Sequence, residues 1–276
     1  MVEKKASFKI CDVIKMFLLF VALQVLVGIF TVFLAIFIGF NTSNPLVSSL
    51  NSIVALALVI SIISRKVKIS IIENLKISNN HRKLIVSIFI FSLGLSIVIS
   101  EIGNYITELF PMSERMIEIF NEIFSGEVSF IGTIIHVIIV APIAEEVLFR
   151  GIMLKGLLKR YSAITSILVT SLLFAIIHLN IYQFVGAFIA GLLLGWLYLK
   201  TESLLLCIIS HAAYNSIGYI LWDLLKLKIK GYTLEGFQPI WFTLFGVLLL
   251  IIFGIIIKKQ VNNSELVDAI YTDIKE

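Results

Sequence analysis

The segment A-E-E-V-L-F-R-G, residues 144–151, places two adjacent carboxylates and a guanidinium inside an apolar stretch. An ionisable side chain within a transmembrane segment costs roughly 2.5–3.5 kcal/mol on insertion scales, so it suggests a functional site by default. On a helix, Glu146 lies one turn before Arg150, the acid-first order that favours an i, i+4 ion pair. Glu145 points about 100° away from this pair. We therefore predict that Glu146 supports the structure and that Glu145 acts as general base or acid. The alternative is that both carboxylates only form salt bridges where the helix leaves the membrane.

Two further clusters have the same helical spacing within apolar segments, Phe174 with His178 and His211 with Asn215. Taken alone, His178 also fits a helix cap, and His211 with Asn215 also fits a polar contact between packed helices. Taken together with Glu145, two histidines and a carboxamide on different helices could activate water and stabilise an oxyanion.

A metal ion is the competing use of these residues. One glutamate and two histidines form a known catalytic zinc ligand set, which here would be Glu145, His178 and His211. The sequence has no H-E-x-x-H motif and no two histidines at i, i+4 on one helix. No cofactor is therefore favoured, and zinc stays the alternative. His136 is also intramembrane, and we expect it in the surroundings of the site, whereas we expect His81 to be solvated.

The composition indicates a polytopic membrane protein. Hydrophobic residues make up 59% of the 276 residues and charged residues only 14%, against about a quarter in soluble domains. A helical span needs about 20 apolar residues, and such runs predict an all-α bundle of about eight transmembrane helices. Most of the 22 basic residues then fall on one side, which predicts a cytoplasmic N-terminus and C-terminus. The predicted spans are 16–40, 46–64, 84–103, 130–149, 163–181, 183–199, 203–222 and 240–257.

The chain divides by hydropathy and motif content into three parts. Residues 1–129 hold the first spans, 130–222 the core helices, and 223–276 the last span and a polar tail. Residues 65–83 form a basic loop, and 101–129 form an acidic external segment. Within it, Ser113 is the expected N-cap of a helix that is either interfacial and amphipathic or packed on the bundle.

The predicted spans raise a difficulty, because straight helices would place Glu145 and His178 near opposite faces of the membrane. We expect Pro142 to break its span, so that 143–160 begins a new helix deeper in the bilayer. We then expect Glu145, His178, His211 and Asn215 to converge on one cavity.

The motifs E-E-V-L-F-R (145–150), F-A-I-I-H (174–178) and H-A-A-Y-N (211–215) together resemble the CPBP family. This family comprises type II CAAX prenyl endopeptidases and bacteriocin-processing proteins, also called the Abi family. The resemblance covers roughly residues 130–222 and all three motifs match in order. It implies an intramembrane endopeptidase in which Glu145 and His178 activate water and His211 and Asn215 stabilise the oxyanion. Glu146, Arg150 and Phe174 would support them.

The resemblance also implies a membrane-embedded or lipid-anchored peptide or protein substrate, and no nucleic acid. The Ile-, Lys- and Asn-rich composition is typical of a low-GC bacterium, which favours the plasma membrane and peptide processing or bacteriocin immunity over CAAX cleavage. Two other functions compete with this one. They are a non-catalytic scaffold or immunity protein and, less favoured, a proton- or ion-coupled transporter.

Overall fold

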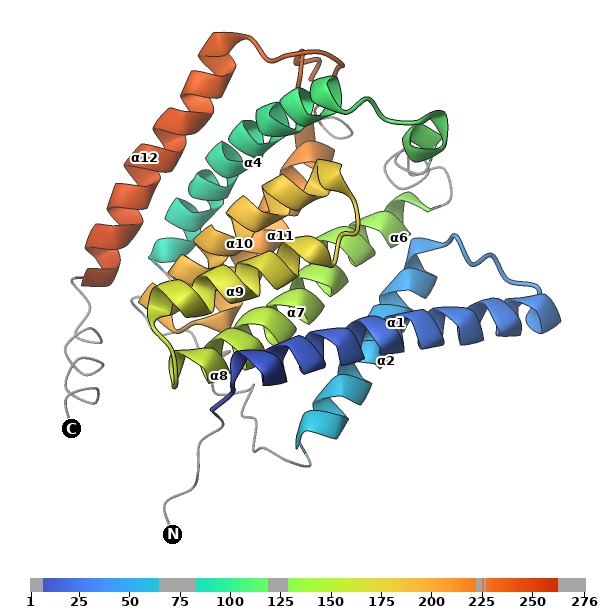
Figure 1. The fold of residues 1–276 in the computed structure, drawn as a ribbon. Helices are drawn as coiled ribbons and strands as arrows, with labels where there is room; N and C mark the ends of the chain where they lie inside the picture. Colours follow the sequence, from blue (N-terminus) through green and yellow to red (C-terminus); the bar gives the residue numbers. More distant parts are fainter. Residues whose placement is uncertain (1–6, 65–82, 119–128, 222–224, 226, 263–276) are drawn as a thin grey trace.

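The fold is a bundle of helices, as the computed structural model in Figure 1 shows. The structure describes residues 7–64, 83–118, 129–221, 225 and 227–262, and His81 and most of the basic loop lie outside these ranges. Every named element in the described residues is helical, which confirms the predicted all-α class. The elements are α1 (Ile10–Ile38), α2 (Pro45–Ser64), α4 (Leu84–Leu109), α6 (Phe130–Ile134), η2 (Ile135–Val140), α7 (Ala141–Glu146), η3 (Val147–Leu154), α8 (Lys155–Leu158), α9 (Ala163–Ile176), α10 (Ile181–Thr201), α11 (Leu204–Tyr219) and α12 (Ile240–Asn262).

Six of the described helices are long and apolar enough to cross a membrane. Two shorter apolar helices, Ala163–Ile176 and Leu204–Gly218, accompany them. At about 1.5 Å per residue, the 14 residues of α9 span only about 21 Å, less than the hydrocarbon thickness of roughly 30 Å. The chain is thus a multi-pass membrane bundle. The number of crossings and the side on which each terminus lies stay predictions.

The predicted break at Pro142 is wrong. Residues Phe130–Leu158 form one continuous helical run of 29 residues, well beyond the predicted end at 149. Because the run is long and α9 is short, Glu145 and His178 lie at similar distances from the turn at 159–162 that joins them. The difficulty raised by the predicted spans is therefore resolved by helix lengths and not by a new helix start.

The predicted external segment at 101–129 begins too early, because α4 continues to Leu109. Glu101 is buried in this helix, and its Oε2 accepts hydrogen bonds from Asn104 Nδ2 at 2.8 Å and from Gln238 N at 2.9 Å. The predicted cap at Ser113 is confirmed, since its Oγ accepts from the Met116 N–H at 3.3 Å. The remainder of that expected helix, from 119 to 128, lies outside the described residues.

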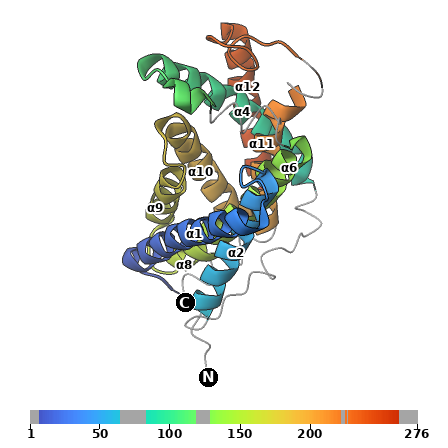
Figure 2. The same cartoon turned by 90° about the vertical axis from the view of Figure 1, so that its right-hand side faces the viewer.

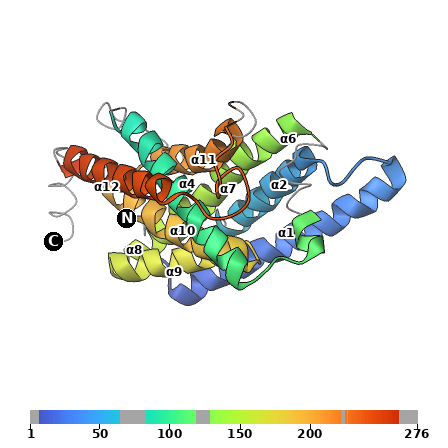
Figure 3. The same ribbon diagram turned by 90° about the horizontal axis from the view of Figure 1, so that it is seen from above.

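Helices α4 and α12 pack tightly where two glycines meet. A Cβ built on Gly94 would lie 2.7 Å from the Gly246 carbonyl oxygen and 2.9 Å from the Leu249 Cβ. The two backbones can approach this closely only because these positions lack side chains. Seen from above, α12 lies at one edge of the bundle and α1 near the opposite edge (Figure 3).

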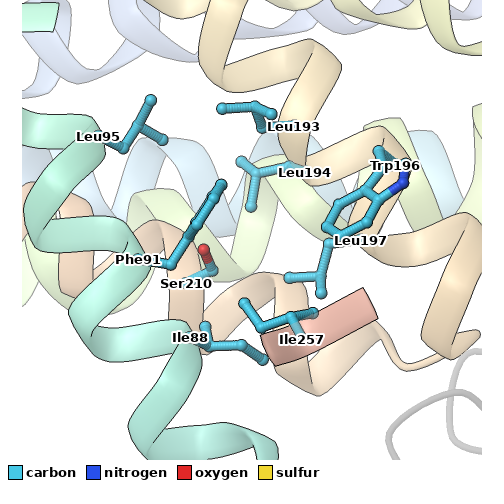
Figure 4. A pocket seen from close by; sticks show the side chains of 9 residues that line it. All are labelled: Ile88, Phe91, Leu95, Leu193, Leu194, Trp196, Leu197, Ser210 and Ile257. Carbon is cyan, nitrogen blue, oxygen red and sulfur yellow. The ribbon is translucent and has the colours of Figure 1, made fainter. Parts of the chain in front are cut away.

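Helices α1 and α2 pack against each other as a hairpin (Figure 2). Helix α2 also contacts η2 and α7. A small apolar pocket lies elsewhere, between α4, α10, α11 and α12 (Figure 4). Its volume of about 10 Å³ is no more than one water needs, and none of the predicted site residues lines it. This pocket is a packing gap. The polar cavity described below is formed instead against the α1–α2 hairpin.

The α4–α12 crossing predicts unequal effects of the same substitution on one helix. Gly94→Ala should lower the free energy of unfolding by roughly 1–3 kcal/mol, because its methyl group meets backbone atoms that cannot move aside freely. Gly103→Ala, also on α4, meets nothing within 4 Å and should be neutral or stabilising by up to about 1 kcal/mol. Thermal unfolding in detergent measures both variants, and equal destabilisation would contradict the close crossing.

Candidate functional site

The helical run that carries Glu145 widens into π-helix on both sides of it. Residues Ile135–Val140 and Val147–Leu154 are π-helical and flank the short α7. Such π segments are frequent at functional sites, since they leave backbone groups without their usual partners. Here the Ala141 N–H donates to the His136 carbonyl, five residues back.

Asn215 supplies a hydrogen bond that this irregular backbone lacks. The next nitrogen in the five-residue register belongs to Pro142, which has no N–H to offer the Val137 carbonyl. Asn215 Nδ2 on α11 donates to that carbonyl at 2.8 Å. A backbone carbonyl inside a bilayer needs such a partner because no bulk water reaches it. Pro142 thus follows the widened turns without breaking the helix, and a side chain from another helix supplies the missing donor.

Glu146 lies at the centre of a fully buried polar cluster. Its side chain has no exposed surface, and its Oε1 accepts from Arg150 Nη1 at 2.8 Å and lies 2.9 Å from His211 Nδ1. Arg150 Nη2 also donates to the Gly191 carbonyl at 3.1 Å. The predicted ion pair is therefore present, and it holds an additional partner, His211, that the sequence did not indicate.

Gly191, whose carbonyl accepts from Arg150, lies close to α9, since a Cβ there would lie 2.9 Å from the Ser171 Cβ. The missing side chain lets α10 approach α9. Among the described residues, Glu146 Oε2 and Arg150 Nε are buried without a hydrogen-bond partner. The cluster thus depends on Glu146 Oε1 for most of its connections.

Phe174 connects this cluster to both histidines. The Arg150 guanidinium carbon lies 4.7 Å from its ring centroid, within the range of cation–π attraction. The rings of His178 and His211 pack edge-on against Phe174, with centroid separations of 5.5 and 5.6 Å. Phe174 is thus placed to fix the positions of three polar side chains at once.

His178 follows α9 in a tight turn whose polar groups are satisfied locally. Its Nδ1 lies 3.0 Å from the Phe174 carbonyl, so the ring also closes the end of the helix. Asn180 Nδ2 donates to the His178 carbonyl at 2.8 Å. Asn180 Oδ1 accepts from the Gln183 N–H and so caps the first turn of α10. Leu179 takes the left-handed conformation between them, with φ 54°. The turn therefore holds His178 firmly beside the core.

Glu145 faces a polar cavity of about 150 Å³. Its side chain is 22% exposed, while that of Glu146 is fully buried, so only Glu145 can meet a molecule in the cavity. His178 and His136 line the same space, and α1 and α2 form its other wall. The cavity is lined by Phe20, Gln24, Ser52, His136, Ala141, Ala144, Glu145, Ile177 and His178.

The four residues expected to converge divide into two groups. Glu145 and His178 line the cavity, whereas His211 and Asn215 do not, so the expected convergence of all four on one cavity is wrong. His211 stays next to the first group, because its Nε2 lies 3.9 Å from Glu145 Oε2. Asn215 is bonded to the Val137 carbonyl and is not among the cavity-lining residues. The sequence also did not assign Gln24 and Ser52 to the site, because nothing in their local pattern distinguishes them from ordinary polar residues within a span.

Zinc is the competing use of these residues. Glu145, His178 and His211 supply donor types that zinc prefers. Nevertheless, the described residues contain no group of three or more His, Cys, Asp or Glu side chains placed to hold a metal ion.

Comparison with known proteins identifies the part of the chain that carries this site. Residues 127–217 match the family model described as type II CAAX prenyl endopeptidase Rce1-like. The match confirms the resemblance. The Rce1-like segment contains Glu145, Glu146, Arg150, Phe174, His178, His211 and Asn215.

A relative from Escherichia coli, described as an uncharacterized 24.3 kDa protein, is 33% identical over 93 residues. This match covers 32% of the present chain and 43% of the relative. No solved structure matches the chain significantly. The helices α1 and α2, which form one wall of the cavity, lie outside the Rce1-like segment.

The contact between Asn215 and the π-helix predicts a coupling with Pro142. Asn215→Ala should lower the free energy of unfolding by roughly 1–3 kcal/mol, because it leaves the Val137 carbonyl unpaired. In a Pro142→Ala background, the backbone regains an N–H at this position, and the same substitution should cost less. Unfolding of the four proteins in detergent tests this, with Ser216→Ala as a neighbouring control. Equal losses in both backgrounds would contradict the proposed role of Pro142.

The two adjacent glutamates should respond differently to the same change. Glu146→Gln leaves the buried Arg150 charge uncompensated and should destabilise the protein by about 3–5 kcal/mol. Glu145→Gln changes a cavity-facing side chain and should cost less than about 1 kcal/mol. Adding Arg150→Met to Glu146→Gln should recover part of the loss, and failure to do so would contradict the ion pair as its cause. Chemical or thermal unfolding provides the measurement.

Proposed function

We propose that the protein is an intramembrane endopeptidase that hydrolyses a peptide bond of a membrane-associated protein or peptide. The observation that carries this proposal is the shared cavity, in which the Glu145 carboxylate and the His178 ring meet the same space beside a buried ionic cluster. The match of residues 127–217 to the Rce1-like family supports the same activity.

The chemistry follows from the acceptors that line the cavity. A carbonyl oxygen only accepts hydrogen bonds, so the contact with Phe174 places a proton on His178 Nδ1. In the neutral ring, Nε2 then carries a lone pair and can hold a water molecule together with Glu145. As the water oxygen bonds to the substrate carbonyl carbon, Glu145 takes one of its protons. The proton passes from Glu145 to the amide nitrogen as the C–N bond breaks, which yields a carboxylic acid and an amine and restores the Glu145 carboxylate.

His211 is suited to stabilise negative charge in this reaction. Glu146 is already bound to Arg150 and accepts from His211 Nδ1, which leaves Nε2 directed toward Glu145 at 3.9 Å. In the imidazolium form, His211 can donate from Nε2–H to the oxyanion, whose negative charge balances that of the ring, while its Nδ1–H stays bonded to Glu146. For Asn215, the bond to Val137 supports a positioning role in place of the oxyanion contact expected from the family.

The substrate proposed is a leader peptide or bacteriocin-related peptide in a bacterial plasma membrane, with a prenylated CAAX-type protein as the alternative. The apolar wall of the cavity, which includes Phe20 and Ile177, suits a segment that enters from the lipid. Its polar residues suit the peptide bond itself. The reaction assigned to Glu145 is the same for either substrate.

The proposal predicts that Glu145→Gln abolishes cleavage while the protein stays folded. Cells producing the wild-type protein should contain new peptide termini that cells producing Glu145→Gln lack, as measured by terminal-peptide mass spectrometry. With the purified protein and a synthetic peptide that spans one such site, kcat should fall by roughly 10²–10⁴, the usual contribution of a general base. Unfolding curves should coincide.

Glu108→Gln, at the C-terminal end of α4, provides the matched control and should cleave like the wild type. Identical peptide termini in wild-type and Glu145→Gln cells would contradict the proposed endopeptidase activity and favour a scaffold or immunity role. Chelator treatment and metal analysis of the active protein complete the test. We expect chelator-insensitive cleavage, and loss of activity that returns only with added zinc would contradict the metal-free mechanism.

A further inference from the structure

His136 lines the reaction cavity but belongs to none of the three motifs. Its Nδ1 lies 3.2 Å from the hydroxyl of Ser49 on α2. That hydroxyl also donates to the Pro45 carbonyl at 3.0 Å. A serine hydroxyl has a single proton, and a carbonyl can only accept. Ser49 Oγ must therefore accept from His136, which places a proton on His136 Nδ1.

This contact determines what His136 offers to the cavity. In a neutral imidazole, a proton on Nδ1 leaves a lone pair on Nε2. His178 is held in the same way by the Phe174 carbonyl. Both cavity histidines thus expose a hydrogen-bond acceptor, and in each case the Nδ1 contact fixes the orientation of the ring.

His136 and Glu145 approach the cavity from different levels of one helical run. The two residues are nine positions apart on one helical run, which corresponds to roughly 13 Å along its axis. His136 therefore lies at another level of the cavity, where an extended substrate would continue beyond the bond being cleaved.

We propose that His136 is a substrate-binding residue whose Nε2 accepts a hydrogen bond from a backbone N–H of the bound peptide. Ser49, outside the Rce1-like segment, is its positioning residue. This inference rests on the proposed protease function. Extended peptides present backbone N–H groups whatever their sequence, so this contact would bind many substrates and leave the choice among them to other wall residues.

The protonation of the His136 ring can be tested without any substrate. Nitrogen-15 NMR of histidine-labelled protein in detergent should show His136 protonated at Nδ1 and bare at Nε2, with the signal assigned by its loss in His136→Phe. Ser49→Ala should abolish this preference, whereas Ser49→Thr, which keeps the hydroxyl, should retain it. A proton on Nε2 in the neutral wild-type ring would overturn the proposal.

Kinetics on the cleaved peptide test the binding role. His136→Phe keeps a planar ring but removes the acceptor, so KM should rise roughly tenfold while kcat changes less than about twofold. Ser49→Ala should also raise KM. Ser61→Ala is the control and should leave KM unchanged, because the Ser61 hydroxyl donates to the Ala57 carbonyl on its own helix. An unchanged KM, or a loss confined to kcat, would overturn the proposal. Both outcomes differ from failure of the protease itself, in which even the wild type cleaves nothing.

Discussion

One buried oxygen, Glu146 Oε1, holds the site together. It contacts Arg150 on its own helix and His211 on α11, while Arg150 reaches across to the Gly191 carbonyl on α10. Three helical segments are thus joined through one carboxylate in a region where charge is costly. Phe174 on α9 packs against the guanidinium and both neighbouring histidines, so a fourth helix takes its position from the same cluster. Removing the carboxylate would leave an unpaired buried cation and release His211, which links stability to the geometry of the proposed reaction.

The second constraint is the backbone of the 130–158 run. Pro142 lies where the helix is already widened, and its missing N–H is compensated by Asn215 from α11. The widened turns bring His136 and Glu145 to the same cavity. The helix lengths also matter. Because α9 has only 14 residues, His178 at its end lies level with Glu145 and lines the same cavity. Together these features place Glu145 and His178 at one cavity inside an apolar bundle.

Local patterns predicted much of this arrangement. Apolar runs gave the helices, and the i, i+4 spacing predicted the Glu146–Arg150 pair, because both depend on residues close in sequence. The partners of His211 and Asn215 were not predictable in this way, since each contact joins residues more than 60 positions apart. The predicted end of the span 163–181 is wrong, since α9 ends at Ile176, because hydropathy does not show where a helix ends within an apolar region. The contribution of Gln24, Ser49 and Ser52 depends entirely on how the α1–α2 hairpin docks.

The central claim is that two adjacent carboxylates are separated into a structural one and a chemical one by their surroundings. Labelling of the intact protein with a membrane-permeant carbodiimide, followed by tandem mass spectrometry of the peptide that contains both, measures this directly. The account predicts modification of Glu145, which faces the cavity, and none of Glu146, which is buried and bound to Arg150 and His211. Modification of Glu146 in preference to Glu145, or of both equally, would contradict it.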